Sequence, residues 1–394
     1  MNVKKVGIIG GGIVGTAIGY YLSEYPFIEV TLFEKDQIGS GTTAKSSGTV
    51  CLFDDSLSHE FWPVRLYGFQ TYLRMEAEER GSAGFDNSGT LVVATDRDVE
   101  QFIKTGIGLT KAEGYHAEYI TDKKRIADIV ADMNVDKVLG AGWTMADGYF
   151  DPTVAANTFV KKMKANGGEM LMFTKVTNIK VSNNTVKGIE TDKGSYDFDI
   201  VIDASGPWTR YTSRMVGLEL PVWHTKAEVF FLVPVGKKLG YDLPVLKYPR
   251  FYARSEGDNI FICKAHLTMD LSDPMQAGIW DPDKLTPTGG TDEYYEELLF
   301  EQLEEHMPGL LESGISSSWL GYRAETPDFL PILGETPVNG YVLATGCGGN
   351  GVIEAPAIAR DLSLYIATGI KSPYLQRLPL SRFANKFDLS AVPK

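Results

Sequence analysis

The chain has 394 residues, of which 51 are acidic and 38 basic, so its formal net charge is −13. Hydrophobic residues make up 43% and charged residues 23%, a balance typical of a folded globular protein and not of a disordered chain. The length exceeds what one hydrophobic core usually serves, so we expect two structural units. The acidic balance argues against a nucleic-acid partner, which needs basic patches.

The cysteines and the N-terminal apolar run bound the class of protein further. Cys51, Cys263 and Cys347 lie far apart with no Cys-x-x-Cys motif, which excludes a zinc site made of cysteines and argues against a disulfide framework. We therefore expect no metal and a cytoplasmic location. Residues 6–14 are interrupted by glycines, lack a cleavage site and are too short to span a bilayer, so we expect no transmembrane segment.

The first predicted elements form a βαβ unit. Residues 6–9 read as a short buried strand, residues 13–24 as a helix with an apolar stripe that Pro26 ends, and residues 29–34 as a second strand. Strand, helix and strand within about 30 residues predict a parallel strand pair.

The rest of the chain alternates between helical and strand patterns. Helices are predicted over residues 62–80, 99–113, 152–166, 292–306 and 352–368, and Asp151 is the expected N-cap of the third. Strands are predicted over residues 90–94, 198–204, 226–233 and 341–344, with three short strands in 170–189 and two in 251–264. Residues 270–290 read as a long loop. This alternation predicts interleaved domains and not two separate ones.

Glycine is the unusual entry in the composition, at 41 residues, and one group of glycines has a specific use. Gly10-Gly11-Gly12-Ile13-Val14-Gly15 matches G-x-G-x-x-G between a strand and a helix, where backbone N–H groups and the helix N-terminus can hold a pyrophosphate. Glu34 ends the second strand and can accept hydrogen bonds from ribose hydroxyls. The unit predicts dinucleotide binding; the alternative is a glycine-rich turn with a surface glutamate.

Three later features favour FAD over NAD. Gly39-Ser40-Gly41-Thr42-Thr43 follows the second strand, Ala204-Ser205-Gly206-Pro207-Trp208 follows the strand at 198–204, and a second glycine cluster, residues 346–351, opens the helix at 352–368. A second helix N-terminus can stabilise the negative charge of a reduced flavin, whereas a nicotinamide dinucleotide needs only one such site. An ordinary strand–helix turn is the alternative for the second cluster.

Together these motifs resemble the FAD-dependent D-amino-acid oxidase superfamily, and within it the glycine oxidase, sarcosine oxidase and dye-linked L-proline dehydrogenase branch. The resemblance covers nearly the whole chain. It implies an α/β (α+β overall) fold with a Rossmann-like FAD-binding domain, residues 1–84, 144–218 and 319–394, interleaved with an antiparallel-sheet substrate domain, residues 85–143 and 219–318. It also implies oxidation of a C–N bond by hydride transfer to flavin N5, giving an imine that hydrolyses.

The resemblance points to candidate substrate-binding residues. Arg323, in a segment similar to the family's Gly-x-Arg-x-x-Thr-x-Asp, is implied to bind a substrate carboxylate through its planar fork; the alternative is pairing with Glu325 or Asp328. Tyr252 lies in an aromatic-x-Arg strand and is an expected substrate contact, with Arg254 structural; the alternative for Tyr252 is a core side chain.

Two further candidates follow on the next predicted strand. Lys264 resembles the lysine that assists oxygen reaction in sarcosine oxidases, and His266 is a plausible proton acceptor. An outward lysine and a hydrogen-bonded or exposed histidine are the alternatives.

Departures from the family set further expectations. Gly321 stands where covalent sarcosine oxidases carry a flavin-linked cysteine, and Ala44-Lys45 where dimethylglycine and sarcosine dehydrogenases carry Trp-His, so we expect noncovalent FAD. Residues 49–52 offer no second arginine, which puts sarcosine in doubt.

The residues implied to contact FAD are Gly10, Gly12, Ile13, Val14, Gly15, Glu34, Lys35, Gly41, Thr42, Thr43, Ser46, Ser47, Gly48, Val176, Ala204, Ser205, Gly206, Trp208, Gly321, Arg323, Gly346, Gly348, Gly349, Asn350, Gly351 and Val352. The expected partners are an amine or amino-acid substrate (glycine, sarcosine, proline or D-amino-acid type) and oxygen or another electron acceptor. A homo- or hetero-oligomer remains open. The alternative functions are a non-catalytic or electron-transfer FAD-binding subunit and an NAD(P)-linked dehydrogenase.

Overall fold

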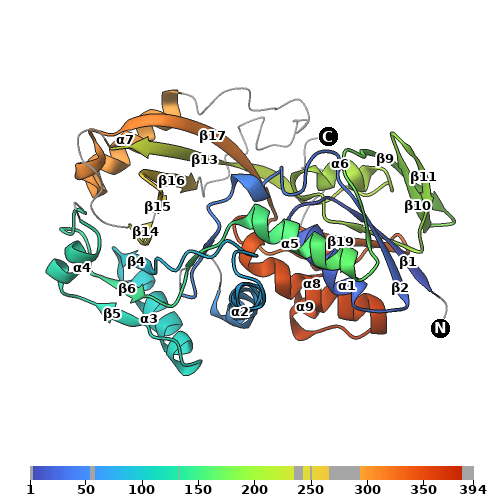
Figure 1. The fold of residues 1–394 in the computed structure, drawn as a ribbon, viewed down its shortest axis with the longest axis horizontal. Helices are drawn as coiled ribbons and strands as arrows, with labels where there is room; N and C mark the ends of the chain where they lie inside the picture. Colours follow the sequence, from blue (N-terminus) through green and yellow to red (C-terminus); the bar gives the residue numbers. More distant parts are fainter. Residues whose placement is uncertain are drawn as a thin grey trace.

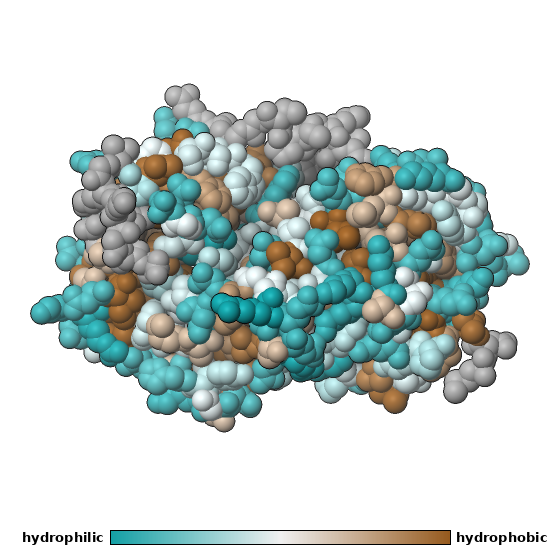
Figure 2. Space-filling view, in the orientation of Figure 1, coloured by the Kyte–Doolittle hydropathy of each residue, from teal (hydrophilic) through white to brown (hydrophobic). Residues whose placement is uncertain are grey.

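Two sheets and the helices packed on them organise the chain (Figure 1). The computed structural model describes residues 3–53, 58–131, 133–234, 243–248, 251–265 and 293–383. In Figure 1 the larger sheet occupies the left half of the view and the parallel sheet the right half. Hydrophilic side chains cover most of the face seen in Figure 2. Among the described helices, none combines the length and apolar character that crossing a bilayer requires.

The first sheet has six strands and is parallel except at one edge. Its order is β18 (Ile332–Glu335), β19 (Tyr341–Thr345), β12 (Ile200–Asp203), β1 (Lys4–Ile9), β2 (Ile28–Phe33) and β8 (Glu169–Leu171), with only β18 antiparallel to its neighbour. Helix α1 (Ile13–Ser23) connects β1 to β2, and Ile8 pairs with Leu32 in the parallel register. The predicted βαβ unit is confirmed.

The parallel sheet lies between a layer of helices and a small three-stranded sheet. Alternate side chains of its strands point to opposite faces. Ile8, Leu32 and Ile202 belong to the core cluster that includes α1, whereas Ile9 and Val201 belong to a separate cluster on the other face. That second cluster includes a three-stranded antiparallel sheet of β9 (Val176–Ser182), β10 (Thr185–Thr191) and β11 (Gly194–Asp197).

The helical layer is built from elements far apart in sequence. Helix α1 packs against α5 (Pro152–Ala165) and α8 (Gly351–Thr368), and α2 (Trp62–Glu78) packs against α8. The side chain of Asp151 accepts hydrogen bonds from the N–H groups of Thr153 and Val154 at 2.8 and 3.0 Å, which confirms the predicted N-cap. Helix α1 follows β1 and α8 follows β19, and both strands are parallel to β12, so both glycine clusters lie at the same edge of the sheet.

The second sheet has eight strands and is antiparallel apart from one pair. Its order is β17 (Gly314–Glu325), β13 (Trp223–Val233), β16 (Asn259–Ala265), β15 (Phe251–Glu256), β14 (Val245–Tyr248), β4 (Thr90–Ala94), β6 (Gly140–Thr144) and β5 (Glu118–Ile120), and only β14 and β4 are parallel. The remaining elements are α3 (Arg97–Ala112), α4 (Lys123–Ile129), α6 (Thr209–Arg214), α7 (Glu293–His306), α9 (Pro373–Arg377) and the strand pair β3 (Thr49–Val50) and β7 (Gly148–Tyr149).

The two faces of the eight-stranded sheet have different neighbours. Phe230 and Ile262 pack into a core cluster with Ile126 of α4 and Leu303 of α7. Their neighbours along the strands, such as Cys263, belong to a small cluster on the opposite face. Helices thus cover one face, and the other is free to form the wall of a site.

The predicted fold class is confirmed, because a parallel nucleotide-binding type of sheet alternates along the chain with a mostly antiparallel one. The predicted loop at residues 270–290 lies outside the described residues. The proposed domain limits stay a prediction, and the one at residue 319 falls inside β17.

Candidate active site

One cavity of about 1160 Å³ runs between the two sheets and is lined by both glycine clusters. Of the residues predicted to contact FAD, Gly15 and Gly48 do not line this cavity, whereas all the others do. Tyr252 lines it as well. Ligand pockets usually measure about 300–1,000 Å³, so this cavity has room for a dinucleotide together with a small substrate.

Gly15 and Gly48 shape the site by allowing close backbone approaches, and their contact with FAD stays a prediction. A Cβ atom on Gly15 would lie 2.0 Å from the carbonyl oxygen of Gly10, so only glycine lets α1 start this close to β1. Gly48 has a φ of +65°, and a Cβ there would lie 1.9 Å from the carbonyl oxygen of Phe150.

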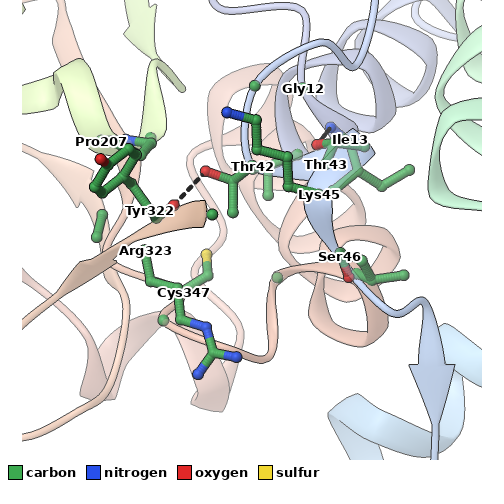
Figure 3. A pocket seen from close by; sticks show the side chains of 18 of the residues that line it. Gly12, Ile13, Thr42, Thr43, Lys45, Ser46, Pro207, Tyr322, Arg323 and Cys347 are labelled. Atoms are coloured by element: carbon green, nitrogen blue, oxygen red, sulfur yellow. Dashed lines mark hydrogen bonds between the residues drawn. The ribbon is translucent and has the colours of Figure 1, made fainter. Parts of the chain in front are cut away.

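The first glycine cluster, residues 10–15, forms a tight turn against a neighbouring loop. Gly10 has a φ of +107°, and a Cβ on it would lie 2.5 Å from the carbonyl oxygen of Ala204. The N–H of Ile13 at the start of α1 donates to Oγ1 of Thr43 at 3.0 Å (Figure 3). The turn, the helix N-terminus and two loops thus meet at one end of the cavity, the arrangement that a pyrophosphate needs.

Glu34 and Trp208 line the same end of the cavity. Oε2 of Glu34 accepts the N–H of Gly11 and Oε1 accepts that of Asp36, both at 2.8 Å. Burial raises the pKa of this carboxyl, and the two N–H donors partly offset the shift. Nζ of Lys35 lies 4.0 Å from the centre of the Trp208 ring. The carboxylate is available for ribose hydroxyls beside a flat aromatic surface.

A buried network around Asp203 fixes the loop that contains Ala204, Ser205 and Gly206. Oδ1 of Asp203 accepts the N–H of Ser205 at 3.0 Å, and Oδ2 accepts the hydroxyls of Thr209 and Tyr341 at 3.1 and 2.6 Å. Asp203 is wholly buried at the end of β12. Sequence analysis assigned this loop to FAD but did not find the carboxylate that holds it.

The second glycine cluster, residues 346–351, packs directly on β17. A Cβ on Gly348 would lie 2.4 Å from Oε2 of Glu325, and one on Gly349 would lie 3.2 Å from Nη1 of Arg323. Gly348 also has a φ of +50°, which favours glycine. The cluster opens α8 as predicted, and its glycines allow two charged side chains of β17 to touch the backbone.

Arg323 lies on the cavity wall and is bonded to Tyr252. Its Nη2 donates to the Tyr252 hydroxyl at 3.2 Å, and Figure 3 shows its side chain among those that line the cavity. No carboxylate of the described residues comes within ion-pair distance of its guanidinium. The alternative of pairing with Asp328 is wrong, because Asp328 binds Arg382 instead, at 2.8 Å.

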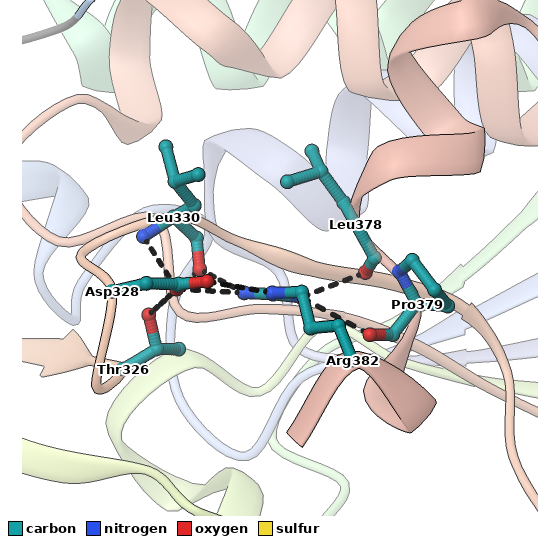
Figure 4. Close-up of polar contacts among 6 residues, drawn as sticks. All are labelled: Thr326, Asp328, Leu330, Leu378, Pro379 and Arg382. Atoms are coloured by element: carbon teal, nitrogen blue, oxygen red, sulfur yellow. Dashed lines mark hydrogen bonds and ion pairs between the residues drawn. The ribbon is translucent and has the colours of Figure 1, made fainter. Parts of the chain in front are cut away.

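The Asp328–Arg382 pair belongs to a hydrogen-bonded cluster behind the cavity (Figure 4). Arg382 also donates to the carbonyl oxygens of Leu330 and Leu378, at 2.7 and 3.0 Å, and Asp328 accepts from Thr326 at 3.1 Å. These contacts tie the turn after β17 to the chain that follows α9. The Thr-x-Asp part of the motif therefore holds β17 in place.

The other predicted substrate residues have different surroundings. Tyr252 pairs with Cys263 in the β15–β16 register, and both line the cavity. Arg254 donates through Nε to the carbonyl oxygen of Ser47 at 3.0 Å, consistent with a structural role. Lys264 pairs with Glu228 in the β13–β16 register, and His266 lies outside the described residues.

Several cavity residues were missed by the sequence analysis. Arg65 of α2 lines the cavity and donates to the carbonyl oxygen of Cys51 at 2.9 Å. Residues 49–52 contain no arginine, but Arg65 contacts this segment from α2. Lys45 lines the cavity, and burial lowers the pKa of its ammonium. Glu325 lines it as well. Only the tertiary fold brings these side chains together.

All three cysteines, Cys51, Cys263 and Cys347, line the cavity, and none of them forms a disulfide. Burial raises the pKa of Cys263 and that of Cys347, so both thiols stay protonated at neutral pH. In the described part of the chain, no cluster of three or more histidine, cysteine or acidic side chains could hold a metal ion.

Comparisons with known proteins point to one class of protein. A family model described as FAD dependent oxidoreductase matches residues 5–363. The chain is 28% identical over 379 residues to mitochondrial dimethylglycine dehydrogenase of Rattus norvegicus, covering 92% of this chain and 43% of that protein. It therefore spans less than half the length of that relative.

Two further similarities cover almost the whole length of both compared chains. Glycine oxidase of Bacillus licheniformis is 23% identical over 385 residues, which cover 95% of this chain and 96% of that protein. The crystal structure of L-proline dehydrogenase from P. horikoshii is 26% identical with a TM-score of 0.78, covering 97% of this chain and 98% of that one.

Proposed function

The chain belongs to the FAD-dependent oxidoreductase family, and from this membership we propose that it oxidises the C–N bond of an amino acid or secondary amine. When bound, FAD would accept a hydride at N5, and the imine product would hydrolyse. The family answers the cofactor question in favour of FAD over a nicotinamide dinucleotide. Oxygen or another acceptor would reoxidise the flavin.

The observation that carries this proposal is the position of Arg323. Its guanidinium lines the cavity beside Gly349 and is bonded to a neutral tyrosine, with no described carboxylate at ion-pair distance. A guanidinium without a carboxylate partner in a cavity is a planar fork for a substrate carboxylate. A carboxylate held there would place its α-carbon next to the second glycine cluster, where the family resemblance puts the flavin ring.

Each glycine-lined end of the cavity would bind a different part of FAD. The first glycine cluster and Glu34 would hold the pyrophosphate and ribose, and the second cluster would face the flavin. A reduced flavin carries negative charge, which the N-terminus of α8 would stabilise.

We further propose that FAD is held without a covalent bond. Neither Gly321 nor Lys45 offers the cysteine or histidine side chain that links flavin in relatives, although both line the cavity. Acid precipitation tests this directly. The yellow colour should stay in the supernatant, and a yellow protein pellet would contradict the proposal.

The activity is tested by an anaerobic screen of glycine, sarcosine, proline, D-amino acids and N-methyl amines. A substrate should bleach the flavin absorbance at about 450 nm, a value that belongs to flavins in general. If FAD is bound and none of these compounds bleaches it, the chain is better explained as a non-catalytic FAD-binding subunit.

A further inference from the structure

Glu325 is a carboxylate in the cavity that the proposed oxidation does not yet use. It lies two residues from Arg323 on β17, so the two side chains share a face of the strand. Its exposed fraction is 8%, and it lines the same cavity. Oε1 accepts a hydrogen bond from Thr225 on the neighbouring strand at 3.4 Å, which orients the carboxyl group.

The charged groups of Arg323 and Glu325 meet the second glycine cluster at consecutive residues. The guanidinium lies so close to Gly349 that a Cβ on this residue would be 3.2 Å from Nη1. Oε2 of Glu325 lies so close to Gly348 that a Cβ there would be 2.4 Å away. Neighbouring Cα atoms are about 3.8 Å apart, so a cation and an anion stand side by side along one short piece of backbone. They form no ion pair within the described residues, which leaves both charges available to a ligand.

We propose that Glu325 binds the ammonium group of the substrate and accepts one of its protons, so that the preferred substrates are zwitterionic α-amino acids. An α-amino acid carries its carboxylate and its ammonium on one carbon, and it can therefore meet Arg323 and Glu325 together. In the proton transfer an N–H bond breaks and an O–H bond forms on Glu325. The electron pair stays on nitrogen, as hydride removal requires. This inference rests on the proposed function and names its substrate class.

The other titratable groups around Glu325 favour this role. Arg323 faces it from β17, Cys347 from the loop before α8, and Glu354 from α8 itself. Burial raises the pKa of Glu325, and Arg323 partly offsets the shift. Burial also keeps the Cys347 thiol protonated and raises the pKa of Glu354 to about 8, so neither adds a negative charge at neutral pH. A base whose pKa lies nearer neutrality is better matched to accepting a proton.

The test compares the binding of two unreactive ligands to the FAD-loaded protein by calorimetry. 2-Aminoisobutyrate is a zwitterion without an α-hydrogen, so it cannot be oxidised, and pivalate is the same shape with methyl in place of ammonium. Wild type should bind 2-aminoisobutyrate at least about tenfold more tightly at pH 7.5, since a charged hydrogen bond contributes that much. The preference should increase as pH rises through the pKa of Glu325.

Variants separate the carboxylate from the rest of the site. Glu325→Gln should bind the two ligands about equally, because it keeps the shape but loses the charge, and Glu325→Asp should retain part of the preference. Glu335→Gln is the matched control, since Glu335 ends β18 in an exposed ion pair with Lys371. If Glu325→Gln does not retain FAD, Glu325→Asp and the pH series on wild type decide.

The outcomes distinguish this inference from the proposed function. A wild type without preference, or a Glu325→Gln variant with an unchanged preference, overturns the role of Glu325 even if an amino acid bleaches the flavin. A wild type that shows the preference while no amino acid bleaches its flavin overturns the proposed oxidation and leaves the zwitterion site standing.

Discussion

Nη2 of Arg323 donates to the hydroxyl of Tyr252 at 3.2 Å and thereby joins β17 to β15, two strands that the sheet order separates by β13 and β16. Cys263 of β16 also lies against the guanidinium. Arg323, Tyr252 and Cys263 all line the cavity. This bond fixes the orientation of the arginine that we propose binds the substrate carboxylate.

Replacing Arg323 should remove carboxylate binding. Arg323→Met is expected to lower the kcat/KM of flavin reduction by an amino acid by a factor of about 10² or more, because a charged hydrogen bond contributes about 1.5–3 kcal/mol and a bidentate pair makes two. Anaerobic stopped-flow measures the rate. Arg377→Met, an exposed arginine of α9, is the control. Equal rates in wild type and Arg323→Met would remove Arg323 from the site.

Tyr252→Phe should have a smaller effect. It removes one neutral hydrogen bond from the guanidinium, so the substrate KM should rise by about tenfold or less, with kcat less changed. The same stopped-flow assay applies, with Tyr365→Phe on the far part of α8 as control. A loss as large as that of Arg323→Met would mean that Tyr252 does more than position the arginine.

Asp203→Asn should weaken both the fold and FAD binding. The amide replaces a wholly buried carboxylate that accepts from Ser205, Thr209 and Tyr341, and an unmatched buried donor reduces stability by about 1–3 kcal/mol. Denaturant unfolding measures the first effect, and titration of apoprotein with FAD the second. Asp197→Asn, on an exposed ion pair, should reduce stability much less and leave FAD affinity unchanged. Unchanged FAD affinity would show that the network does not position the loop.

Glu354 should make stability fall as pH rises. It is 1% exposed in the first turn of α8, and neither of its oxygens has a hydrogen-bond partner among the described residues. Burial raises its pKa to about 8 from an ordinary 4.5, so between these values only the folded chain keeps the proton. The free energy of unfolding should therefore decrease from pH 4.5 to 8, by a contribution on the order of 5 kcal/mol.

The variant Glu354→Gln isolates this contribution. It should leave stability near pH 5 almost unchanged and raise the melting temperature at pH 8.5. Glu335→Gln should act in the opposite direction at pH 8.5, since it removes an exposed ion pair whose carboxyl has a lowered pKa. An equal effect of Glu354→Gln at both pH values would contradict a protonated Glu354 in the folded protein.

Local signals explain which elements could be predicted from sequence. Neighbouring residues specify the turn at residues 10–15, the Asp151 cap and the glycine cluster before α8. The structure has all three as expected. Strand β17 was missed, because Ser316, Ser317 and Ser318 break its apolar alternation. Its pairing with β13, which is distant in sequence, holds it in the sheet.

The candidate site could likewise be predicted only where its residues belong to a local motif. Such motifs predicted Arg323 and the glycines. Arg65, Lys45 and Glu325 could not be predicted, because each reaches the cavity from a different element. No local pattern in the sequence shows that they lie in one site. The motif specifies Arg323, whereas it does not specify Glu325 two residues later.

The most direct test of the account is anaerobic flavin bleaching by α-amino acids in wild type and Arg323→Met. At least one α-amino acid should reduce the bound FAD of wild type, and Arg323→Met should slow this reduction by a factor of about 10² while retaining its flavin. FAD that no amino acid or secondary amine reduces, or that Arg323→Met reduces at the wild-type rate, would contradict it.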